Sequence, residues 1–268
     1  MRAAGKGGKA TVAGPGRGRQ SEDALKSLQK VLSILETFST TRRSLSLAEI
    51  SAATGLPRST AHRFAASMRD VGLLDQDRRR DHYRLGLKLF ELGNVVLANM
   101  DLHREARPQV DALSRITGHL VHLAAFDGRQ AIVIHRVDPT PDGGTPLTLI
   151  EAAPVHCTSV GKAILAFQVP SAIDAIVDGG LKRYTEATIT DGRRLRAELK
   201  RIRERGYAVD EGEHQPGIRC IGAPIREQSG RVVAGLSVSG PARGMPKDQI
   251  EQLARIVVHH AGLISARL

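Results

Sequence analysis

The segment 58–63 (Arg-Ser-Thr-Ala-His-Arg) places several hydrogen-bond donors within two turns of a potential helix. An arginine can donate two hydrogen bonds to a guanine, and short hydroxyls suit contacts with phosphates or base edges. The N-terminal residues of a helix that enters the major groove of DNA reach the base edges in this way. The segment therefore predicts DNA contacts by Arg58, Ser59, Thr60, His62 and Arg63.

A second basic group lies about fifteen residues further along, in the segment Asp77-Arg-Arg-Arg-Asp81. Two short extended pieces flank it, which predicts a β-hairpin with Arg78, Arg79 and Arg80 at its tip. These arginines could neutralise phosphates or enter a minor groove, and each phosphate contact would add to the salt dependence of binding. A run of charge is also typical of an ordinary solvated surface, so this segment alone decides nothing.

A different set of polar residues lies on apolar strands in the second half of the chain. Ser237 and Ser239 are two residues apart, so their hydroxyls share one face of a strand. Cys220 is on a neighbouring strand and Asp210 follows a short strand. The start of a helix offers free N–H groups that favour an anion. Further candidates come immediately before such a helix, at Thr158, Ser159 and Val160.

A few polar groups in an apolar pocket are typical of a small-molecule site, here one for a small carboxylate. The same residues also have ordinary structural roles open to them. Serines on strands commonly bond locally, a cysteine is often a small buried hydrophobe, and the threonine-serine pair could merely start a helix.

The N-terminal elements would position the first set of residues. Helical periodicity begins at Leu25, and a short helix follows with Ser46 as N-cap, Glu49 completing a capping box and Gly55 ending it. Pro57 then opens the helix that contains the donor-rich segment. Its apolar stripe consists of Ala61, Phe64, Ala65 and Met68, and Gly72 ends it. Three helices followed by a basic hairpin predict a winged helix-turn-helix.

The second half of the chain has a different pattern. A helix over 87–100 leads away from the hairpin, and we place the domain boundary near residue 100. Strands are predicted at 119–126 and 130–137, joined by Asp127-Gly128, and around 147–150, 218–226 and 231–239. Helices are predicted at 159–167, 171–177, 193–205 and 247–266. This order indicates an α+β fold in which helices pack at one face or end of an antiparallel sheet.

Composition narrows the class of protein. The net charge is +11, of which the first twenty residues contribute +5, and that Gly/Ala-rich stretch predicts a disordered basic tail. Such a charge suits a nucleic-acid partner. No run of about 18 apolar residues predicts a membrane span, and two isolated cysteines fit a reducing cytoplasm. The absence of Trp argues against base-stacking platforms for single strands.

The order of motifs resembles the IclR family of bacterial transcription regulators. The resemblance is carried by LAEISAATGLPRSTAHRFAASMRDVGLL and YRLGLKLFELG, and then by HCTSVGKAILAF, RYTEATITD, IRERGYAVDEGEH and GIRCIGAPIREQSGRVVAGLSVSGP. It covers about residues 24–268 and leaves only the basic tail outside.

The resemblance implies a tail at 1–23, a winged helix-turn-helix at 24–86, a linker helix at 87–101 and a GAF-like effector-binding domain at 102–268. It implies a ligand-responsive repressor or activator in the bacterial cytoplasm, associated with the nucleoid through operator DNA. The effector would be a small organic acid or aromatic carboxylate. We also expect a dimer that reads two half-sites, pairing further into a tetramer, and no cofactor, metal or membrane partner.

The same resemblance assigns ligand contacts to particular residues. Backbone N–H groups would act at Ser159 and Val160 and hydroxyls at Ser237 and Ser239, with further contacts from Thr158, Asp210 and Cys220. Leu147 and Leu149 would form apolar walls. Glu151 departs from the neutral or basic stretch expected there, which leaves the charge and size of the ligand open.

The residues also leave other classes of protein to consider. A Cys-dependent enzyme would use Cys220 with His156, His214 and Asp210, but no family signature places a histidine against the thiol. The histidine pairs show no spacing typical of zinc ligands. A non-specific, architectural DNA-binding protein would account for the charge but has no need of the second domain.

Overall fold

The computed structural model describes residues 16–76, 82–139 and 152–268. It consists of two compact units that divide between Val96 and Leu97. The predicted hairpin tip with Arg78, Arg79 and Arg80 and the predicted walls with Leu147, Leu149 and Glu151 lie outside the described residues.

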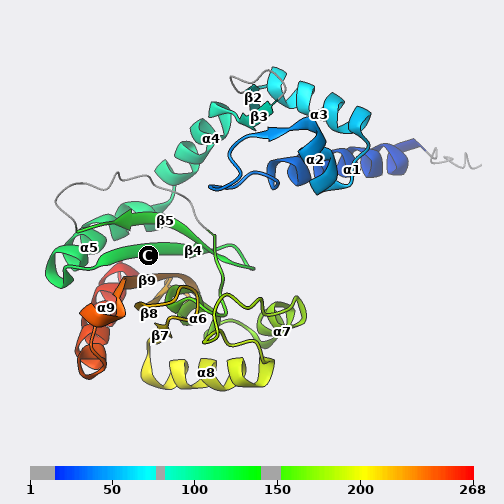
Figure 1. Cartoon of the computed structure of the whole chain (residues 1–268). Helices are drawn as coiled ribbons and strands as arrows, with labels where there is room; N and C mark the ends of the chain where they lie inside the picture. Colours follow the sequence, from blue (N-terminus) through cyan, green and yellow to red (C-terminus); the bar gives the residue numbers. More distant parts are fainter. Residues whose placement is uncertain (1–15, 77–81, 140–151) are drawn as a thin grey trace, which may run out of the picture. The chain divides into compact units, whose positions relative to one another are not determined.

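The N-terminal unit contains the helices and hairpin that the sequence predicts (Figure 1). Its elements are α1 (Gly16–Leu35), β1 (Leu45–Ser46), α2 (Leu47–Thr54), α3 (Arg58–Asp70), β2 (Leu74–Gln76), β3 (His82–Leu85) and most of α4 (Leu87–Ala98), whose last two residues belong to the C-terminal unit. The three strands form an antiparallel sheet in the order β1-β3-β2. Its core is built from Ile34, Phe38, Leu45, Ile50, Ala61, Ala65, Met68, Leu74 and Tyr83.

The local signals around α2 are confirmed. The Ser46 side chain accepts a hydrogen bond from the Glu49 backbone N–H, and the Ser46 N–H donates to Glu49 Oε2 over 2.8 Å. Gly55 ends the helix in the left-handed region, at φ 69°, where a side chain would be strained. The turn from Gly55 to Pro57 therefore fixes the direction in which α3 starts.

Two features of this unit differ from the expectation. β1 was not predicted, because a two-residue strand carries no periodic signal; its Leu45 pairs with Tyr83 of β3. In addition, α1 begins at Gly16, so the helix extends into the segment 1–23 that was expected to be a disordered tail. No proline interrupts residues 16–23, and extending a nucleated helix costs little.

The C-terminal unit is an α+β domain around one antiparallel sheet, as predicted. It contains α5 (Asp101–Thr117), β4 (Leu120–Phe126), β5 (Ala131–Val137), β6 (Ala152–Ala153), α6 (Ser159–Leu165), α7 (Pro170–Asp178), α8 (Gly192–Arg205), β7 (Ala208–Glu211), β8 (Ile218–Arg226), β9 (Val232–Pro241), two short 3₁₀ turns (Ala242–Gly244, Lys247–Gln249) and α9 (Ile250–Ser265). The strand order is β6-β5-β4-β9-β8-β7.

Helices cover both faces of this sheet, not one face or end as expected (Figure 1). One core lies between the sheet and α5 with α9, and it includes Val110, Leu123, Ile221, Leu236 and Val257. The other lies under α6 and α8, and it includes Val133, Ile164, Leu195, Leu199 and Val232. The central strand β9 is buried on both faces, so it lacks the alternation of a half-exposed strand.

Two further expectations need correction. α5 was not predicted, because Pro108 lies within it and proline usually ends a helical pattern. Asp210 was placed after a short strand but lies within β7, paired with Cys220 of β8. Its side chain therefore has a fixed position in the sheet.

Candidate functional site

The predicted contact residues of α3 lie on its solvent face. Arg58, Ser59, His62 and Arg63 are exposed and Thr60 is half-buried. The opposite face is anchored in the core, where Ala61, Ala65 and Met68 are buried. The Arg63 guanidinium lies 5.0 Å from the centre of the half-buried Phe64 ring, a cation–π contact that supports its position.

All seven residues predicted to bind a ligand line one cavity of about 470 Å³ in the C-terminal unit. We call it the sheet cavity. The seven are Thr158, Ser159, Val160, Asp210, Cys220, Ser237 and Ser239. They come from four elements and the residue that caps one of them, so the fold brings together residues up to about eighty positions apart in the sequence.

Strand register explains how this happens. Asp210 pairs with Cys220, Cys220 with Ser239, and Ser239 with Leu120, which makes one row across four strands. A second row runs through Gly222, Ser237, His122 and Arg136. Ser237 and Ser239 share a face because they are two residues apart, so both rows face the cavity.

The N-terminus of α6 lies directly on this face because of two glycines in the sheet. A Cβ at Gly222 would lie 2.7 Å from the backbone C and O of Ser159 and 2.9 Å from the N of Val160. At Gly235 it would lie 2.9 Å from a methyl of Val160. Only the absence of side chains at these positions allows so close an approach of the helix to the strands.

Thr158 has a structural role in this arrangement. Its hydroxyl donates to the carbonyl of Pro154 over 2.8 Å and accepts from the N–H of Gly161 over 3.1 Å. It is the N-cap of α6. The cap leaves the first two helical N–H groups, those of Ser159 and Val160, without an intrahelical acceptor.

The electrostatics favour neutral groups along the cavity wall. Burial raises the pKa of the Cys220 thiol to about 12, and the thiol lies 3.0 Å from the Ser239 hydroxyl. Burial also lowers the pKa of His122 to about 4, which keeps its imidazole neutral at neutral pH. Desolvation likewise raises the pKa of Asp210, opposed by hydrogen bonds from the turn that follows it.

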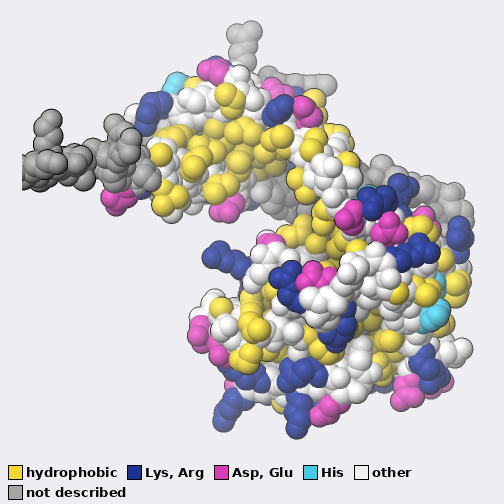
Figure 2. Space-filling model, turned by 180° about the vertical axis from the view of Figure 1, so that it is seen from behind, with side chains coloured by type: hydrophobic (Ala, Val, Ile, Leu, Met, Phe, Trp, Pro, Cys, Tyr) yellow, Lys and Arg dark blue, Asp and Glu magenta, His cyan; other side chains and the backbone are white. Residues whose placement is uncertain are grey.

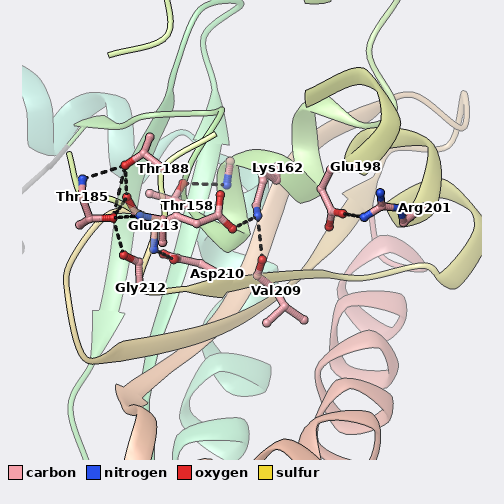
Figure 3. Close-up of polar contacts among 12 residues, drawn as sticks. Thr158, Lys162, Thr185, Thr188, Glu198, Arg201, Val209, Asp210, Gly212 and Glu213 are labelled. Atoms are coloured by element: carbon pink, nitrogen blue, oxygen red, sulfur yellow. Dashed lines mark hydrogen bonds and ion pairs between the residues drawn. The ribbon is translucent and has the colours of Figure 1, made fainter. Parts of the chain in front are cut away.

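An ion pair lies behind the cavity, in the interior of the domain (Figure 3). Lys162 of α6 is 1% exposed; its Nζ bonds Glu213 Oε1 and donates to the carbonyl of Val209 over 2.7 Å. Burial raises the pKa of Glu213 to about 7, and the lysine charge opposes this shift. Glu213 Oε2 is buried and has no hydrogen-bond partner among the residues that the structure describes.

This ion pair holds the turn that carries one side of the cavity. The Glu213 N–H donates to Asp210 Oδ1 over 2.6 Å. Two threonine hydroxyls donate to the same turn, Thr185 to the carbonyl of Gly212 and Thr188 to that of Glu213, over 2.7 and 2.6 Å (Figure 3). Asp210 is thus oriented by the backbone of a turn whose Glu213 side chain pairs with the buried Lys162.

Several residues of the cavity wall on β4, β5 and β8 and in the loops were not predicted from the sequence as ligand contacts. They include His119, His122, Val133, Arg136, Asp138, His214, Gln215 and Ile218. The alternation of Val121, His122 and Leu123 gives His122 the face opposite the α5–α9 core, which is usually a solvent face. Only the pairing of β4 with β9 shows that this face is the cavity.

Comparison with known proteins agrees with these features. The family model described as the bacterial transcriptional regulator IclR C-terminal domain matches residues 94–266, and the IclR helix-turn-helix domain matches residues 27–78. The chain belongs to the IclR family. It is therefore a DNA-binding, ligand-responsive regulator of transcription, which confirms the resemblance seen in the sequence.

Individual relatives match nearly the whole regulator. It is 34% identical to the HTH-type transcriptional regulator KdgR of Escherichia coli K12, over 92% of this chain and 94% of that protein. A solved IclR regulator from Silicibacter sp. TM1040 is 25% identical with a TM-score of 0.79, covering 90% and 95% of the two chains. An IclR homologue from Microbacterium hydrocarbonoxydans, solved with 4-hydroxybenzoate, is 27% identical with a TM-score of 0.74, covering 90% and 98%.

The residues named for the rival classes can be placed in the described structure. The IclR family consists of transcriptional regulators. The thiol of Cys220 contacts Ser239, and His156 Nε2 contacts the carbonyl of Lys182 at 2.9 Å. Among the residues described, no three His, Cys, Asp or Glu side chains are grouped to hold a metal ion. Over the same part of the chain, no helix has the length and apolar character to span a membrane.

Proposed function

We propose that α3 is the recognition helix and that Arg58, Ser59, Thr60, His62 and Arg63 contact the operator. The exposure of four of these five side chains, beside a face anchored in the core, supports this role. Arg78, Arg79 and Arg80 belong to the same proposal, because in the sequence they fall between β2 and β3, two strands that pair with each other.

We infer that the sheet cavity binds the effector, an organic acid or aromatic carboxylate. The observation that carries this inference is that all seven expected ligand residues line one cavity. Its α6 end offers the N–H groups of Ser159 and Val160 and the hydroxyls of Ser237 and Ser239 to a carboxylate. The homologue solved with 4-hydroxybenzoate supports an acid as the ligand. Binding requires no cofactor and no covalent step by Cys220.

An effector changes DNA affinity only if it binds the DNA-competent and DNA-incompetent arrangements with different affinities. We propose that α4 transmits this difference, since it begins in the N-terminal unit and ends in the C-terminal unit. A dimer whose two recognition helices change their spacing would then change its affinity for two half-sites.

Separate substitutions in the two units test this division of labour. Arg63→Ala is expected to weaken operator binding by at least about tenfold, because it removes a charge-assisted contact. Ser237→Ala is expected to retain operator affinity but to require at least about tenfold more acid for the same response. Fluorescence anisotropy on operator DNA, with and without the acid, measures both quantities.

Arg129→Ala is the matched control for Arg63→Ala. Arg129 is exposed in the turn between β4 and β5. Its replacement with alanine removes the same charge from the chain as Arg63→Ala does. It is expected to leave specific binding nearly unchanged. Equal loss of operator binding in the Arg63, Ser237 and Arg129 variants would contradict the proposed roles.

We further propose a homodimer that pairs into a tetramer, as the family resemblance implies. On α1, Leu25, Leu28 and Leu32 are 57%, 62% and 56% exposed, and their spacing places them on one stripe. Hydrophobic side chains gather on the surface of this unit (Figure 2). A stripe of large exposed apolar residues is typical of a protein interface.

Leu28→Asp is therefore expected to produce a smaller species in sedimentation or light scattering, since a buried carboxylate disfavours an apolar interface. Loss of the dimer should also lower operator affinity, because each half-site would bind alone. Ser27→Asp, one residue earlier on an exposed position of α1, introduces the same charge and serves as the control. An unchanged mass in Leu28→Asp would place the interface elsewhere.

A further inference from the structure

Positive charge is concentrated on helix α8 of the C-terminal unit. Its 14 residues include the basic Arg193, Arg194, Arg196, Lys200, Arg201, Arg203 and Arg205 and the acidic Glu198 and Glu204. The net charge of the helix is therefore +5. Residues 97–268 as a whole carry 22 Lys and Arg against 19 Asp and Glu, a net charge of only +3. Several Lys and Arg side chains project from the lower edge of this unit in Figure 2, the edge that α8 forms in Figure 1.

The core of the domain fixes the direction in which α8 presents these cations. Leu195, Leu199 and Ile202 are fully buried in the core that lies under α6 and α8. At the start of the helix, Asp191 Oδ1 accepts a hydrogen bond from the Arg194 backbone N–H over 2.8 Å. Because the apolar residues occupy one side of the helix, the charged residues face the solvent from a rigid support.

Part of this charge is neutralised within the domain. Arg201 and Arg205 donate to Glu198 over 3.0 and 2.8 Å. Arg196 donates to Asp174 of α7 over 2.6 Å. These ion pairs account for arginines in the middle and at the end of α8 as contacts that orient the helix.

Arg193 and Arg194, in the first turn of α8, have no such role. Both are exposed, and within the described part of the chain neither side chain has a hydrogen bond or an ion pair. The first turn of a helix lies at the positive end of its macrodipole, where acidic residues are favoured and cations are not. The first turn of α8 contains no acidic residue. Helix stability therefore does not explain the two arginines, whereas an anionic partner outside the chain does.

The shape of this face indicates what kind of anion fits it. Arg193 and the exposed Lys200 are seven residues apart, so they lie on the same side of α8 and about 10 Å apart along its axis. Duplex DNA carries about six phosphates over that length. The outer face of a helix is convex, so it does not enclose a small anion, but a row of phosphates needs no enclosure. Arginine in particular suits phosphates, because its guanidinium can donate two parallel hydrogen bonds.

We propose that the outer face of α8, with Arg193, Arg194 and Lys200, is a second DNA-contacting surface that binds the phosphate backbone without reading its sequence. The chain belongs to a family of DNA-binding regulators, so DNA is its established partner. DNA that is held by one part of a chain is presented to the rest of that chain at a high effective concentration. Phosphate contacts by α8 then add affinity for every sequence alike and increase the salt dependence of binding.

The double substitution Arg193→Ala with Arg194→Ala in the full-length protein tests the proposal. Fluorescence anisotropy is measured at about 50 to 200 mM salt on two duplexes of equal length, one of random sequence and one from upstream of the gene of this regulator. Loss of two phosphate contacts is expected to lower the slope of log affinity against log salt by about 2. Both duplexes should bind about tenfold more weakly near physiological salt, with the ratio of their affinities unchanged.

Arg129→Ala with Arg255→Ala is the matched control, because it removes the same charge from two exposed positions of the same unit. It is expected to leave the salt slope nearly unchanged. Wild-type slope and affinity in the Arg193 and Arg194 variant would overturn the proposal and leave α8 to an acidic protein or to solvent. An equal loss in the control would overturn it as well, since net charge alone would then decide binding.

Two further readouts separate backbone contacts by α8 from other causes. The melting temperature of the Arg193 and Arg194 variant should not fall, because neither side chain is bonded within the described structure. A lower melting temperature together with weaker binding would indicate a structural role and contradict the proposal. A loss confined to the upstream duplex would also contradict it, because that result would mean that α8 reads sequence.

Discussion

Replacing Lys162 with leucine is expected to lower the free energy of unfolding by about 3–5 kcal/mol, the usual cost of breaking a buried ion pair by removing one partner. Lys162 is 1% exposed and pairs with Glu213 inside the domain. Without the ammonium group, the Glu213 carboxyl would be buried with one oxygen already unpartnered in the described structure. Urea denaturation of the full-length protein, followed by far-ultraviolet circular dichroism, measures the loss.

Two variants separate the buried ion pair from the loss of a lysine in general. Lys200→Leu removes a charge from an exposed pair on α8, where Lys200 Nζ is 3.9 Å from Glu204, and is expected to cost less than about 1 kcal/mol. The double substitution Lys162→Leu with Glu213→Leu removes both charges and should recover much of the loss, because neither charge remains uncompensated. If Lys162→Leu lowers the free energy of unfolding no more than Lys200→Leu does, the buried pair does not hold the turn.

The ion pair between Lys162 and Glu213 also connects the stability of the domain to the geometry of the cavity wall. The Glu213 N–H donates to Asp210, and the Glu213 side chain is held by Lys162. Releasing Glu213 would therefore loosen the turn after β7 that orients Asp210 toward the cavity. We expect Lys162→Leu to weaken acid binding even under conditions in which the protein remains folded, a readout that loss of stability alone would not give.

The parts of the fold that depend on short-range chemistry could be predicted from the sequence. The capping box of Ser46 and Glu49 and the stop at Gly55 act within a few residues, so the pattern alone places α2. The hairpin from β4 to β5 follows from alternation around Asp127-Gly128. Local rules failed at α5, where Pro108 is tolerated because burial of Ala106, Val110 and Leu113 stabilises the helix.

The residues of the cavity likewise divide into those that local sequence patterns predict and those that they do not. Ser237 and Ser239 could be found because they interrupt an apolar strand, and the helix start at Thr158 has a cap signal. His122 and Arg136 could not, because polar residues that alternate with buried ones are typical of any half-exposed strand. Their role depends on strand order, which places β4 beside β9 although more than a hundred residues separate them.

Gly222 places a tight steric demand on the cavity wall, and Gly222→Ala is the second substitution with a large expected effect. Its Cβ would lie 2.7 Å from the Ser159 backbone and 2.9 Å from the Val160 nitrogen. These are backbone atoms, so relief requires α6 or β8 to move. Overpacking of this kind costs about 1–3 kcal/mol.

The same displacement would move the N–H groups of Ser159 and Val160 away from the hydroxyls of Ser237 and Ser239. We therefore expect Gly222→Ala to weaken acid binding by at least about tenfold, measured by titration with 4-hydroxybenzoate, because hydrogen bonds weaken steeply with poor geometry. Gly262→Ala in α9 is the control, since no described atom beyond its chain neighbours and the adjoining backbone of α9 lies within 4 Å of its added Cβ. It should bind acid as the wild type does and gain up to about 1 kcal/mol from higher helix propensity. Equal acid affinity in the two variants would show that the position of the α6 N-terminus does not decide binding.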